Sequence, residues 1–546
     1  MTTPTVVYRA SAVFTGRAGA PLAEAFAVRD GRIIAIGDRE PVEHAAGPDA
    51  HIIDLGDGFV TPGIVEGHTH LLMFGQAVEK VQLRECGSLA EIQERLREAR
   101  AANPDAAMLL GISWRFDALE GRDPTAKMID AAVSEIPVIL DANDLHSVWI
   151  NSAALDVLGI TPDTPDPIGG EIRRDENGEA TGFLLESAAI QHAWNYLADA
   201  ASDADRDRFL ASAFDAYLAT GVTTATDMSF GAPDLAAFER ILIREGRLPF
   251  PITAHMLLHP TGDPAADLAQ VERAAADRDR IAETYGSDSF RVVGVKFILD
   301  GVIDACTAAM RSPYANGSNA EPIWPREAAL AAAVAADAHG LQLALHAIGD
   351  SASDLALDLV EACVRENGPR SSRRPRIEHL EYVAPDTVRR LAALGVTASM
   401  QPVHCDPAVL DNWIAMLGDE RAERGFPWAE MRDAGVRIAL GTDAPTAPHE
   451  APHNLFIALT ARSVLEAARA PYHAERVFTP ADALEAMTHG GAWATGLEDE
   501  VGTLAPGARA NFAVLDLNPF TDDPARLVGT RVSLTVVDGE VRHRAE

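Results

Sequence analysis

The chain has 546 residues, of which 47% are hydrophobic and 23% charged, and acidic residues outnumber basic ones by 81 to 46. This length predicts roughly two to four structural units, and the composition is typical of a folded globular protein. The formal charge of -35 argues against nucleic acid and anionic membranes as partners, because an acidic surface repels both.

Both ends of the chain predict short strands joined by tight turns. The apolar stretches are TVVYRASAVF, AFAVRDGRIIAIG and HIIDLGDGFVTPG near the start, and ANFAVLDLNPF and RVSLTVVDGEVRHR near the end. Asp30-Gly31 and Asp538-Gly539 predict hairpins, because these residue types tolerate positive φ. Neither end can bury a sheet face alone, so we expect one small β-sandwich formed by residues 1–62 and 500–546.

The central part of the chain alternates short apolar strands with Ala- and Leu-rich helical stretches. The predicted strands are 63–70, 221–228, 250–258, 290–298, 341–347, 374–381, 395–402 and 436–444. Eight such units indicate an α/β fold, a (β/α)8 TIM-type barrel over residues 63–499, with its active site at the carboxyl ends of the strands. A doubly wound open sheet is disfavoured, because no Gly-x-Gly-x-x-Gly follows the first strand.

About 150 residues separate the first two predicted strands, far more than an ordinary connection. Residues 75–210 therefore form an inserted α+β subdomain, with a helix in SLAEIQERLREARAAN and a hairpin that turns at Asn177-Gly178. Because the insertion leaves the barrel at the carboxyl end of a strand, we expect it to cover the active site as a cap or pocket wall.

Ionisable residues gather at the carboxyl ends of the predicted strands, where a barrel interior should be apolar. They are His68, His70, Lys296, His346, His379 and Asp443. Each has an ordinary alternative: His346 or Asp443 could cap a helix, and Lys296 could reach the surface. Together they favour a metal site, because imidazoles and carboxylates suit zinc and neighbouring divalent ions. An ammonium beside a dication is unfavourable, so Lys296 should be neutral or converted by carbon dioxide to a bridging carbamate.

These motifs give the chain a resemblance to a known family. The sequence resembles the amidohydrolase superfamily, and within it the amidohydrolase family 3 branch that includes N-substituted formamide deformylases. The matching segments are TPGIVEGHTH, GVKFILDG, LHAIGDSA, RIEHLE, GTDAP and GTLAPGARANFAVLD, with HSVWINSAAL and a GGEI...GFLLE hairpin in the insertion. The resemblance covers essentially the whole chain.

The resemblance implies a role for each residue of the set. His68 and His70 would bind the more buried ion with Asp443, Lys296 would be the carboxylated bridge, and His346 and His379 would hold a second ion. Asp443 would also take the proton from the bridging water. Mononuclear relatives lack the lysine, so Lys296 favours two ions, zinc first, with manganese or iron as alternatives.

Substrate contacts are less well defined by the sequence. Trp114, His146, Trp149 and Glu186 lie in the insertion and are candidates to line the pocket, although both tryptophans could equally belong to the core of the subdomain. Relatives often have a GWD-like run where this chain has Ser113 to Asp117. His404, His449 and His453 follow the last two strands and could face solvent or substrate.

The predicted function is metal-dependent hydrolysis of a carbon–nitrogen bond in an amide, formamide or cyclic amide. The alternatives are a deaminase of a heterocycle, an ester or lactone hydrolase, or a metal-free scaffold protein. We expect a small-molecule substrate and a homodimer. Without an export signal, an apolar run of about 18 residues or a Cys-x-x-Cys pattern, a cytoplasmic protein without a membrane span is expected.

Overall fold

The computed structural model describes residues 4–143, 147–167 and 170–545. The chain divides into two compact units, one formed by residues 1–71 with 214–546 and the other by residues 72–213. None of the described helices is long and apolar enough to cross a membrane.

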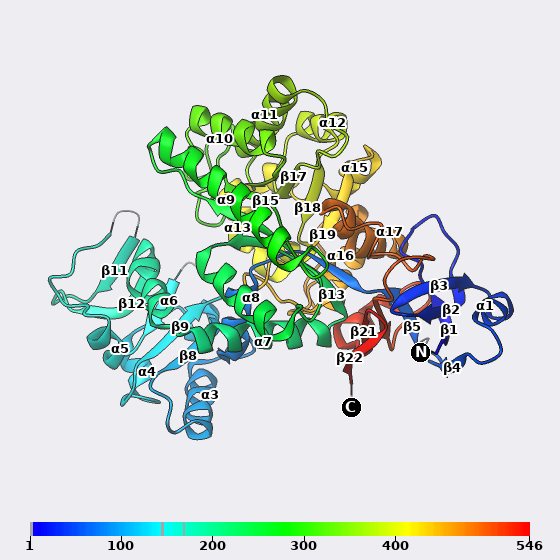
Figure 1. Cartoon of the computed structure of the whole chain (residues 1–546). Helices are drawn as coiled ribbons and strands as arrows, with labels where there is room; N and C mark the ends of the chain where they lie inside the picture. The colour runs from blue at the N-terminus through cyan, green and yellow to red at the C-terminus, as the bar shows by residue number, and fades with distance from the viewer. Residues whose placement is uncertain (1–3, 144–146, 168–169, 546) are drawn as a thin grey trace. The chain divides into compact units, whose positions relative to one another are not determined.

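The first unit contains the predicted parallel barrel, so the (β/α)8 expectation is confirmed (Figure 1). Its strands, in sheet order, are β6 (Ile64–Thr69), β13 (Val222–Phe230), β14 (Ile252–Leu258), β15 (Phe290–Ile298), β16 (Gln342–Ala347), β17 (Arg376–His379), β18 (Thr397–Met400) and β19 (Arg437–Leu440). Nearly every residue of β6, β13 and β17 is buried, as expected for strands covered on both faces.

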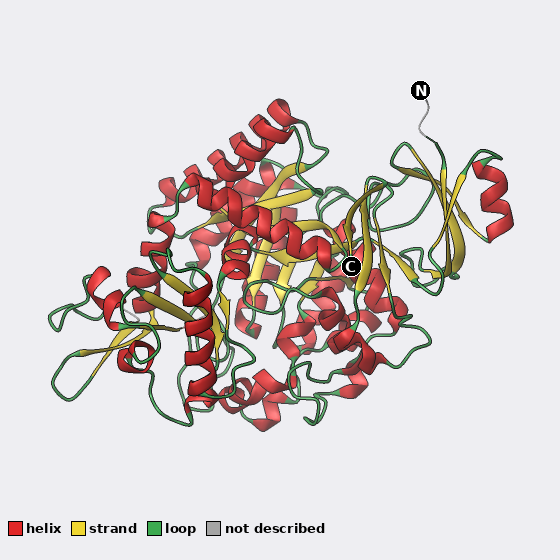
Figure 2. Ribbon diagram, turned by 90° about the horizontal axis from the view of Figure 1, so that it is seen from below, coloured by secondary structure: helices red, strands yellow, loops and turns green. Residues whose placement is uncertain are grey.

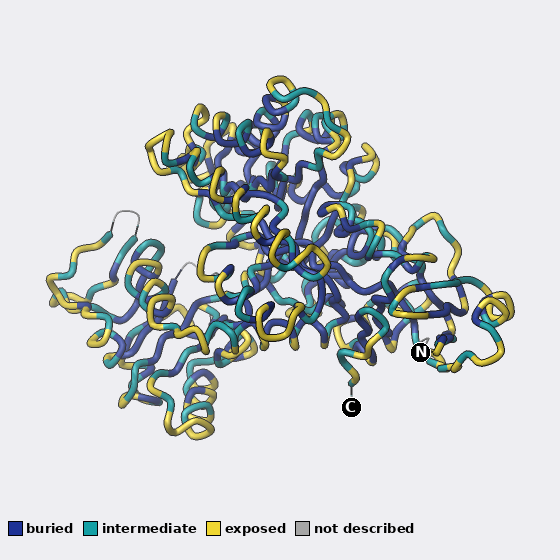
Figure 3. The backbone as a smooth tube through the Cα atoms, viewed as in Figure 1, coloured by how far each residue is buried: buried dark blue, intermediate teal, exposed yellow. Residues whose placement is uncertain are grey.

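Helices follow the barrel strands and lie outside them (Figure 2). The main ones are α7 (Asp203–Ala219), α8 (Ala232–Glu245), α9 (Pro264–Tyr285), α10 (Arg326–Ala338), α11 (Asp350–Asn367), α12 (Pro385–Leu394), α15 (Trp428–Asp433) and α16 (Ala451–Thr460). Shorter ones are α13 (Leu410–Leu417), α14 (Asp419–Ala422), α17 (Pro480–Glu485) and α18 (Gly491–Ala494). Their outer turns are exposed, whereas the strands inside them are buried (Figure 3).

The two ends of the chain share one hydrogen-bonded sheet, which refines the predicted β-sandwich. Its order is β22 (Glu540–Arg544), β21 (Val532–Val537), β20 (Phe512–Leu515), β5 (Phe59–Pro62), β1 (Val6–Val13), β2 (Ala23–Arg29) and β3 (Arg32–Gly37), with β4 (His51–Asp54) beside β1. Phe26 of β2 packs on Phe512 of β20 with ring centroids 5.0 Å apart, so strands distant in the order face a common core. Both Asp-Gly turns have positive φ at each residue, as predicted.

The second unit is an α/β layer built on a six-stranded mixed sheet. The sheet order is β11 (Gly170–Arg174), β12 (Ala180–Glu186), β10 (Ser147–Ile150), β9 (Val138–Ala142), β8 (Leu109–Trp114) and β7 (Val81–Gln82). Its helices include α2 (Leu71–Glu79), α3 (Leu89–Ala102), α4 (Ala126–Asp130), α5 (Ser152–Val157) and α6 (Asn195–Ala200), with a π-helical turn, η2 (Ala189–Trp194). Neighbouring residues such as Leu184 and Phe183 belong to different apolar clusters, so both faces of the sheet are covered.

Candidate metal centre

The barrel closes where the end of β6 meets the loop after β19. Asp443 donates its backbone N–H to the His68 carbonyl over 2.7 Å, and His70 donates to the Ala444 carbonyl over 3.1 Å. A Cβ atom on Gly441 would lie 2.5 Å from the His68 nitrogen, so only glycine permits this approach. The Gly-Thr-Asp and Gly-His-Thr-His segments therefore meet through their backbones.

This closure places Asp443 between two imidazoles. Oδ1 of Asp443 lies 2.9 Å from Nε2 of His70 and 3.4 Å from Nε2 of His68. His379, at the end of β17, brings Nδ1 to 4.0 Å from Oδ2 of the same carboxylate. The ligand atoms of His68, His379 and Asp443 all lie within 4.8 Å of one another, a spacing that a single ion can bridge.

His346 and Lys296 approach the same group from β16 and β15. The rings of His346 and His379 are 4.3 Å apart between centroids. Lys296 is 2% exposed, and no ion pair within 4 Å joins its ammonium to a carboxylate in the part of the chain that the structure describes. All six predicted residues are therefore at the carboxyl end of the barrel strands, and Lys296 is buried there without an ion-pair partner within 4 Å among the described residues.

The electrostatics of the group favour neutral imidazoles. Burial and then the Lys296 charge lower the pKa of His68 to about 4 and that of His346 to about 3. Burial and the neighbouring histidines hold the pKa of His379 well below its usual range. Burial also lowers the pKa of Lys296 to about 8, against the opposing effect of the nearby carboxylates. Neutral imidazole is the form that binds metal.

The carboxylate of Asp443 is ionised in this setting. Burial raises its pKa, but the proximity of His68 and the hydrogen bond from His70 outweigh burial and hold the pKa well below its usual range. Asp443 itself has a φ of 60°, a left-handed conformation that aspartate tolerates better than most residues. The Asp443 carboxylate thus lies among the imidazoles of His68, His70 and His379.

A buried ion pair that the sequence analysis missed orients His68. Glu378 accepts a hydrogen bond from Nδ1 of His68 over 2.7 Å and is itself held by Arg376 at 2.6 Å. Arg376 also donates to the Gly67 carbonyl over 2.7 Å, which ties β17 to β6 across the barrel. With its Nδ1 proton held by Glu378, His68 presents the Nε2 lone pair to the site.

A second missed carboxylate, Glu66, supports the closure of the barrel. It accepts backbone N–H bonds from His68 over 3.1 Å and Thr442 over 2.7 Å, and a hydroxyl bond from Thr442 over 2.9 Å. Burial raises the pKa of Glu66 to about 8. The two-residue period of a strand could have revealed these residues in the sequence. Glu66 is two residues before His68, and Arg376 is two residues before Glu378, so the members of each pair share one face of their strand.

The position of His379 depends on an unusual backbone. A regular strand would send Glu378 and His379 to opposite faces, yet both lie in the same group of side chains. His379 has a φ of 75° and Leu380 a φ of 53°, so the strand breaks here and turns the imidazole. Left-handed residues of this kind are costly and are concentrated at functional sites.

His404, one of three histidines whose role the sequence left open, joins the same group. Its Nε2 lies 3.6 Å from Oδ2 of Asp443 and its Nδ1 3.5 Å from Glu381. Its ring is parallel to that of His379, with the centroids 5.8 Å apart. His453 lies instead near the Val528 carbonyl, at 3.2 Å, and His449 packs near Tyr217.

Of the predicted substrate contacts, the two tryptophans lie inside the core of the inserted unit. Trp114 and Trp149 are fully buried, their rings are 5.4 Å apart, and each indole N–H reaches a backbone carbonyl. Their packing favours the core role over direct contact with substrate. Glu186 ends β12 with a φ of 51°, and His146 lies outside the described residues.

Comparisons with known proteins agree on one family. The sequence profile described as the amidohydrolase family matches residues 51–543. The Arabidopsis thaliana protein named LONG AFTER FAR-RED 3 is 30% identical, over 97% of this chain and 90% of its own. An N-substituted formamide deformylase from Arthrobacter pascens is also 30% identical, over 95% of both chains. The crystal structure of an uncharacterized metal-dependent hydrolase from Pyrococcus furiosus has a TM-score of 0.72 at 26% identity, covering 95% of this chain and 100% of the other.

Proposed function

Because the chain belongs to the amidohydrolase family, we propose that it is a metal-dependent hydrolase that cleaves a carbon–nitrogen bond of an amide, formamide or cyclic amide. The observation that carries the proposal is the convergence of His68, His379 and Asp443 within 4.8 Å at the carboxyl end of the barrel. Similarity to a formamide deformylase supports the choice of bond.

The donor set of the barrel mouth fits a divalent ion. Nδ1 of His70 is buried and has no hydrogen-bond partner among the described residues, so this nitrogen is an unsatisfied polar atom. His68, His346 and His379 have pKa values lowered by burial, so their lone pairs are free at neutral pH. Nitrogen and carboxylate ligands at this spacing favour zinc, with manganese and iron as alternatives.

The presence of Lys296 favours two ions over one. His68, His70 and Asp443 would hold one ion, and His346 and His379 would hold the second. Lys296 would be a shared ligand as its carbamate: the neutral amine would attack the carbon of carbon dioxide, an N–C bond would form as one C–O π bond opens to the carboxylate, and the nitrogen would lose one proton to water. The carbamate is an anion, which divalent ions attract, in place of the ammonium. The lack of an ion-pair partner for Lys296 among the described residues supports this role.

Different side chains have different roles in the proposed hydrolysis. A bound divalent ion supplies Lewis acidity, which lowers the pKa of water and polarises the scissile carbonyl. Asp443 accepts the proton of the attacking water and delivers it to the leaving nitrogen. Glu378 holds the Nδ1 proton of His68, so that the Nε2 lone pair stays directed into the site. Burial of the group excludes bulk water and strengthens each of these interactions.

Metal analysis combined with a substrate screen tests the proposal. Purified protein should contain stoichiometric zinc, manganese or iron, and a chelator should abolish hydrolysis that added metal restores. The screen should cover formamides, N-acyl amino acids, lactams, aminated heterocycles, esters and lactones. Hydrolysis confined to heterocyclic amines or esters would select one of the alternative reactions. Absence of bound metal together with no turnover in the whole screen would favour a scaffold protein.

A reducing compartment, the cytoplasm, accords with the cysteines of the chain. Cys86, Cys306, Cys363 and Cys405 are all free thiols, and three of them are buried. Disulfides are rare in such a compartment. The expected homodimer stays a prediction, which light scattering of the purified protein tests.

A further inference from the structure

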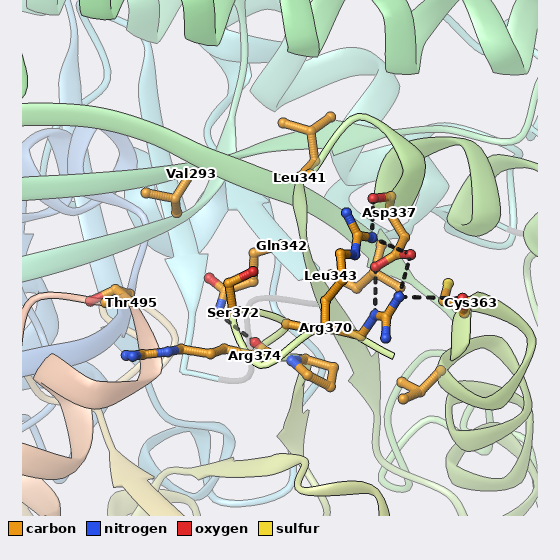
Figure 4. A pocket seen from close by; sticks show the side chains of 15 residues that line it. Val293, Asp337, Leu341, Gln342, Leu343, Cys363, Arg370, Ser372, Arg374 and Thr495 are labelled. Carbon is orange, nitrogen blue, oxygen red and sulfur yellow. Dashed lines mark hydrogen bonds and ion pairs between the residues drawn. The ribbon is translucent and has the colours of Figure 1, made fainter. Parts of the chain in front are cut away.

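A cavity of about 310 Å³ lies at the amino-terminal ends of β15 and β16 (Figure 4). Gln342, which lines the cavity, begins β16, whereas His346 of the metal centre stands near the end of the same strand. The cavity is therefore separate from the candidate active site. Its volume is at the lower end of the range for small-molecule pockets.

The cavity has apolar and cationic walls. Val293, Leu341 and Leu343 form part of the apolar wall. The cationic wall comes from the segment RSSRRPR, which supplies Arg370, Arg373 and Arg374. Asp337 is the one acidic side chain among the described residues that line it, and it pairs with both Arg370 and Arg373. Arg374 pairs instead with Glu498, which is outside the lining. Two guanidinium groups therefore share one carboxylate, in a chain whose formal charge is -35.

The arginines retain unused hydrogen-bond donors. Arg373 binds Asp337 through Nε at 2.7 Å and Nη2 at 2.8 Å, while its Nη1 has no hydrogen-bond partner in the described parts of the chain. Its side chain is only 10% exposed. Nε of Arg370 is buried and also lacks a partner there. Of these two donors, Nε of Arg370 is the buried one, and a buried donor without a partner is costly. A guanidinium is well suited to planar oxyanions.

We propose that this cavity binds a small organic oxyanion, a carboxylate or phosphate attached to a compact apolar group. The anionic oxygens contact Arg370 and Arg373, and the apolar group packs against the Leu341 side of the cavity. The proposal goes beyond the hydrolase activity and does not depend on it, because the site shares no residue with the metal centre. Asp337 remains paired with both arginines and holds their guanidinium groups in place.

Calorimetric titration of the metal-loaded protein tests the chemistry of the ligand. The probes are phenyl phosphate, benzoate, inorganic phosphate and neutral benzamide. One or both aromatic oxyanions should bind more tightly than benzamide and inorganic phosphate, and more weakly as salt is added. The stronger of phenyl phosphate and benzoate identifies the anionic group. Equal binding of benzamide, or no binding of either aromatic oxyanion, overturns the proposal.

A pair of charge variants separates this cavity from the metal centre. Ser372 lines the cavity, whereas its exposed neighbour Ser371 does not. Ser372→Glu should weaken oxyanion binding about tenfold by like-charge repulsion, and Ser371→Glu should leave it nearly unchanged. Both sites are exposed turn positions, so neither variant threatens folding. If Ser372→Glu binds the oxyanion as well as the unaltered protein, the ligand sits elsewhere and the proposal fails.

A second pair removes a donor instead of adding a charge. Arg370→Gln deletes a guanidinium of the cavity, and Arg365→Gln deletes an exposed one on α11 that does not line it. Oxyanion binding should fall only in the first variant, with the melting temperature of each recorded as a folding control. Equal affinity in the two variants would argue against contact with Arg370.

Discussion

Each compact unit contains a buried lysine, and the two lysines differ in their ion-pair partners. In the inserted unit, Nζ of Lys80 lies 2.5 Å from Oδ2 of Asp141, whose other oxygen accepts the Trp194 indole N–H over 2.8 Å. In the barrel unit, Lys296 is also buried but has no ion-pair partner within 4 Å among the described residues.

The two lysines differ in whether a carboxylate partner balances the buried charge. A buried charge whose partners are complete holds two elements together and has no capacity left for a ligand. A buried charge without an ion-pair partner is costly, which is consistent with the reactive role proposed for Lys296. Burial alone would not have distinguished the two lysines.

The largest expected effect comes from removing the anionic charge of Asp443. Asp443→Asn keeps the size of the side chain but loses its basicity, so turnover should fall about 10³-fold while much of the metal remains. Steady-state kinetics and metal analysis of the same sample measure this. Asp433→Asn, on an exposed turn of α15, is the matched control and should retain full activity. Substantial activity in Asp443→Asn would remove its proton-transfer role.

The same substitution at both lysines tests the comparison directly. Lys80→Met leaves Asp141 as an unpaired buried charge and should lower the free energy of unfolding by about 3–5 kcal/mol. Lys296→Met removes an unpaired cation, so the metal-free protein should keep its stability while metal content and activity fall. Urea unfolding and metal analysis give the two readouts. The comparison breaks if both variants lose similar stability.

Removing the carboxylate of Glu378, which orients His68, should have a smaller effect, which is on metal affinity. Glu378→Gln weakens the bond to Nδ1 of His68 and should reduce the affinity for zinc about 10- to 100-fold, measured by competition with a chelator. Glu498→Gln breaks another arginine–glutamate pair, with Arg374, away from the barrel mouth. Zinc affinity should be unchanged in that control. A similar loss in both variants would point to general destabilisation.

Cysteine labelling should show the smallest effect, a difference in rate without a change in function. Burial, followed by the charge of Asp337, raises the pKa of Cys363 to about 12, so almost no thiolate exists at pH 8. Cys306 is the one thiol among the four that is not buried. At pH 8 a thiol reagent should label Cys306 first, and all four cysteines only in urea, as mass spectrometry would show. Early labelling of Cys363 would mean that α11, the helix that contains it, opens readily.

Local sequence pattern was sufficient for the elements of the fold. The eight barrel strands, the Asp-Gly hairpins and the joining of both chain ends follow from apolar runs, turn residues and the need to bury sheet faces. These signals are local, so a single sequence carries them. The six candidate ligands were recognisable because ionisable residues stood out at the ends of apolar strands.

Tertiary structure alone decided which side chains meet. His68 and Glu378 are 310 residues apart and pair across the barrel, and no local pattern encodes such a contact. The left-handed turn at His379 overrides the strand period, and Trp114 enters the core of its unit because the sheet there is covered on both faces. Sequence determines which residue types are available at a strand end, whereas closure of the barrel determines the distances between them, and those distances set the chemistry.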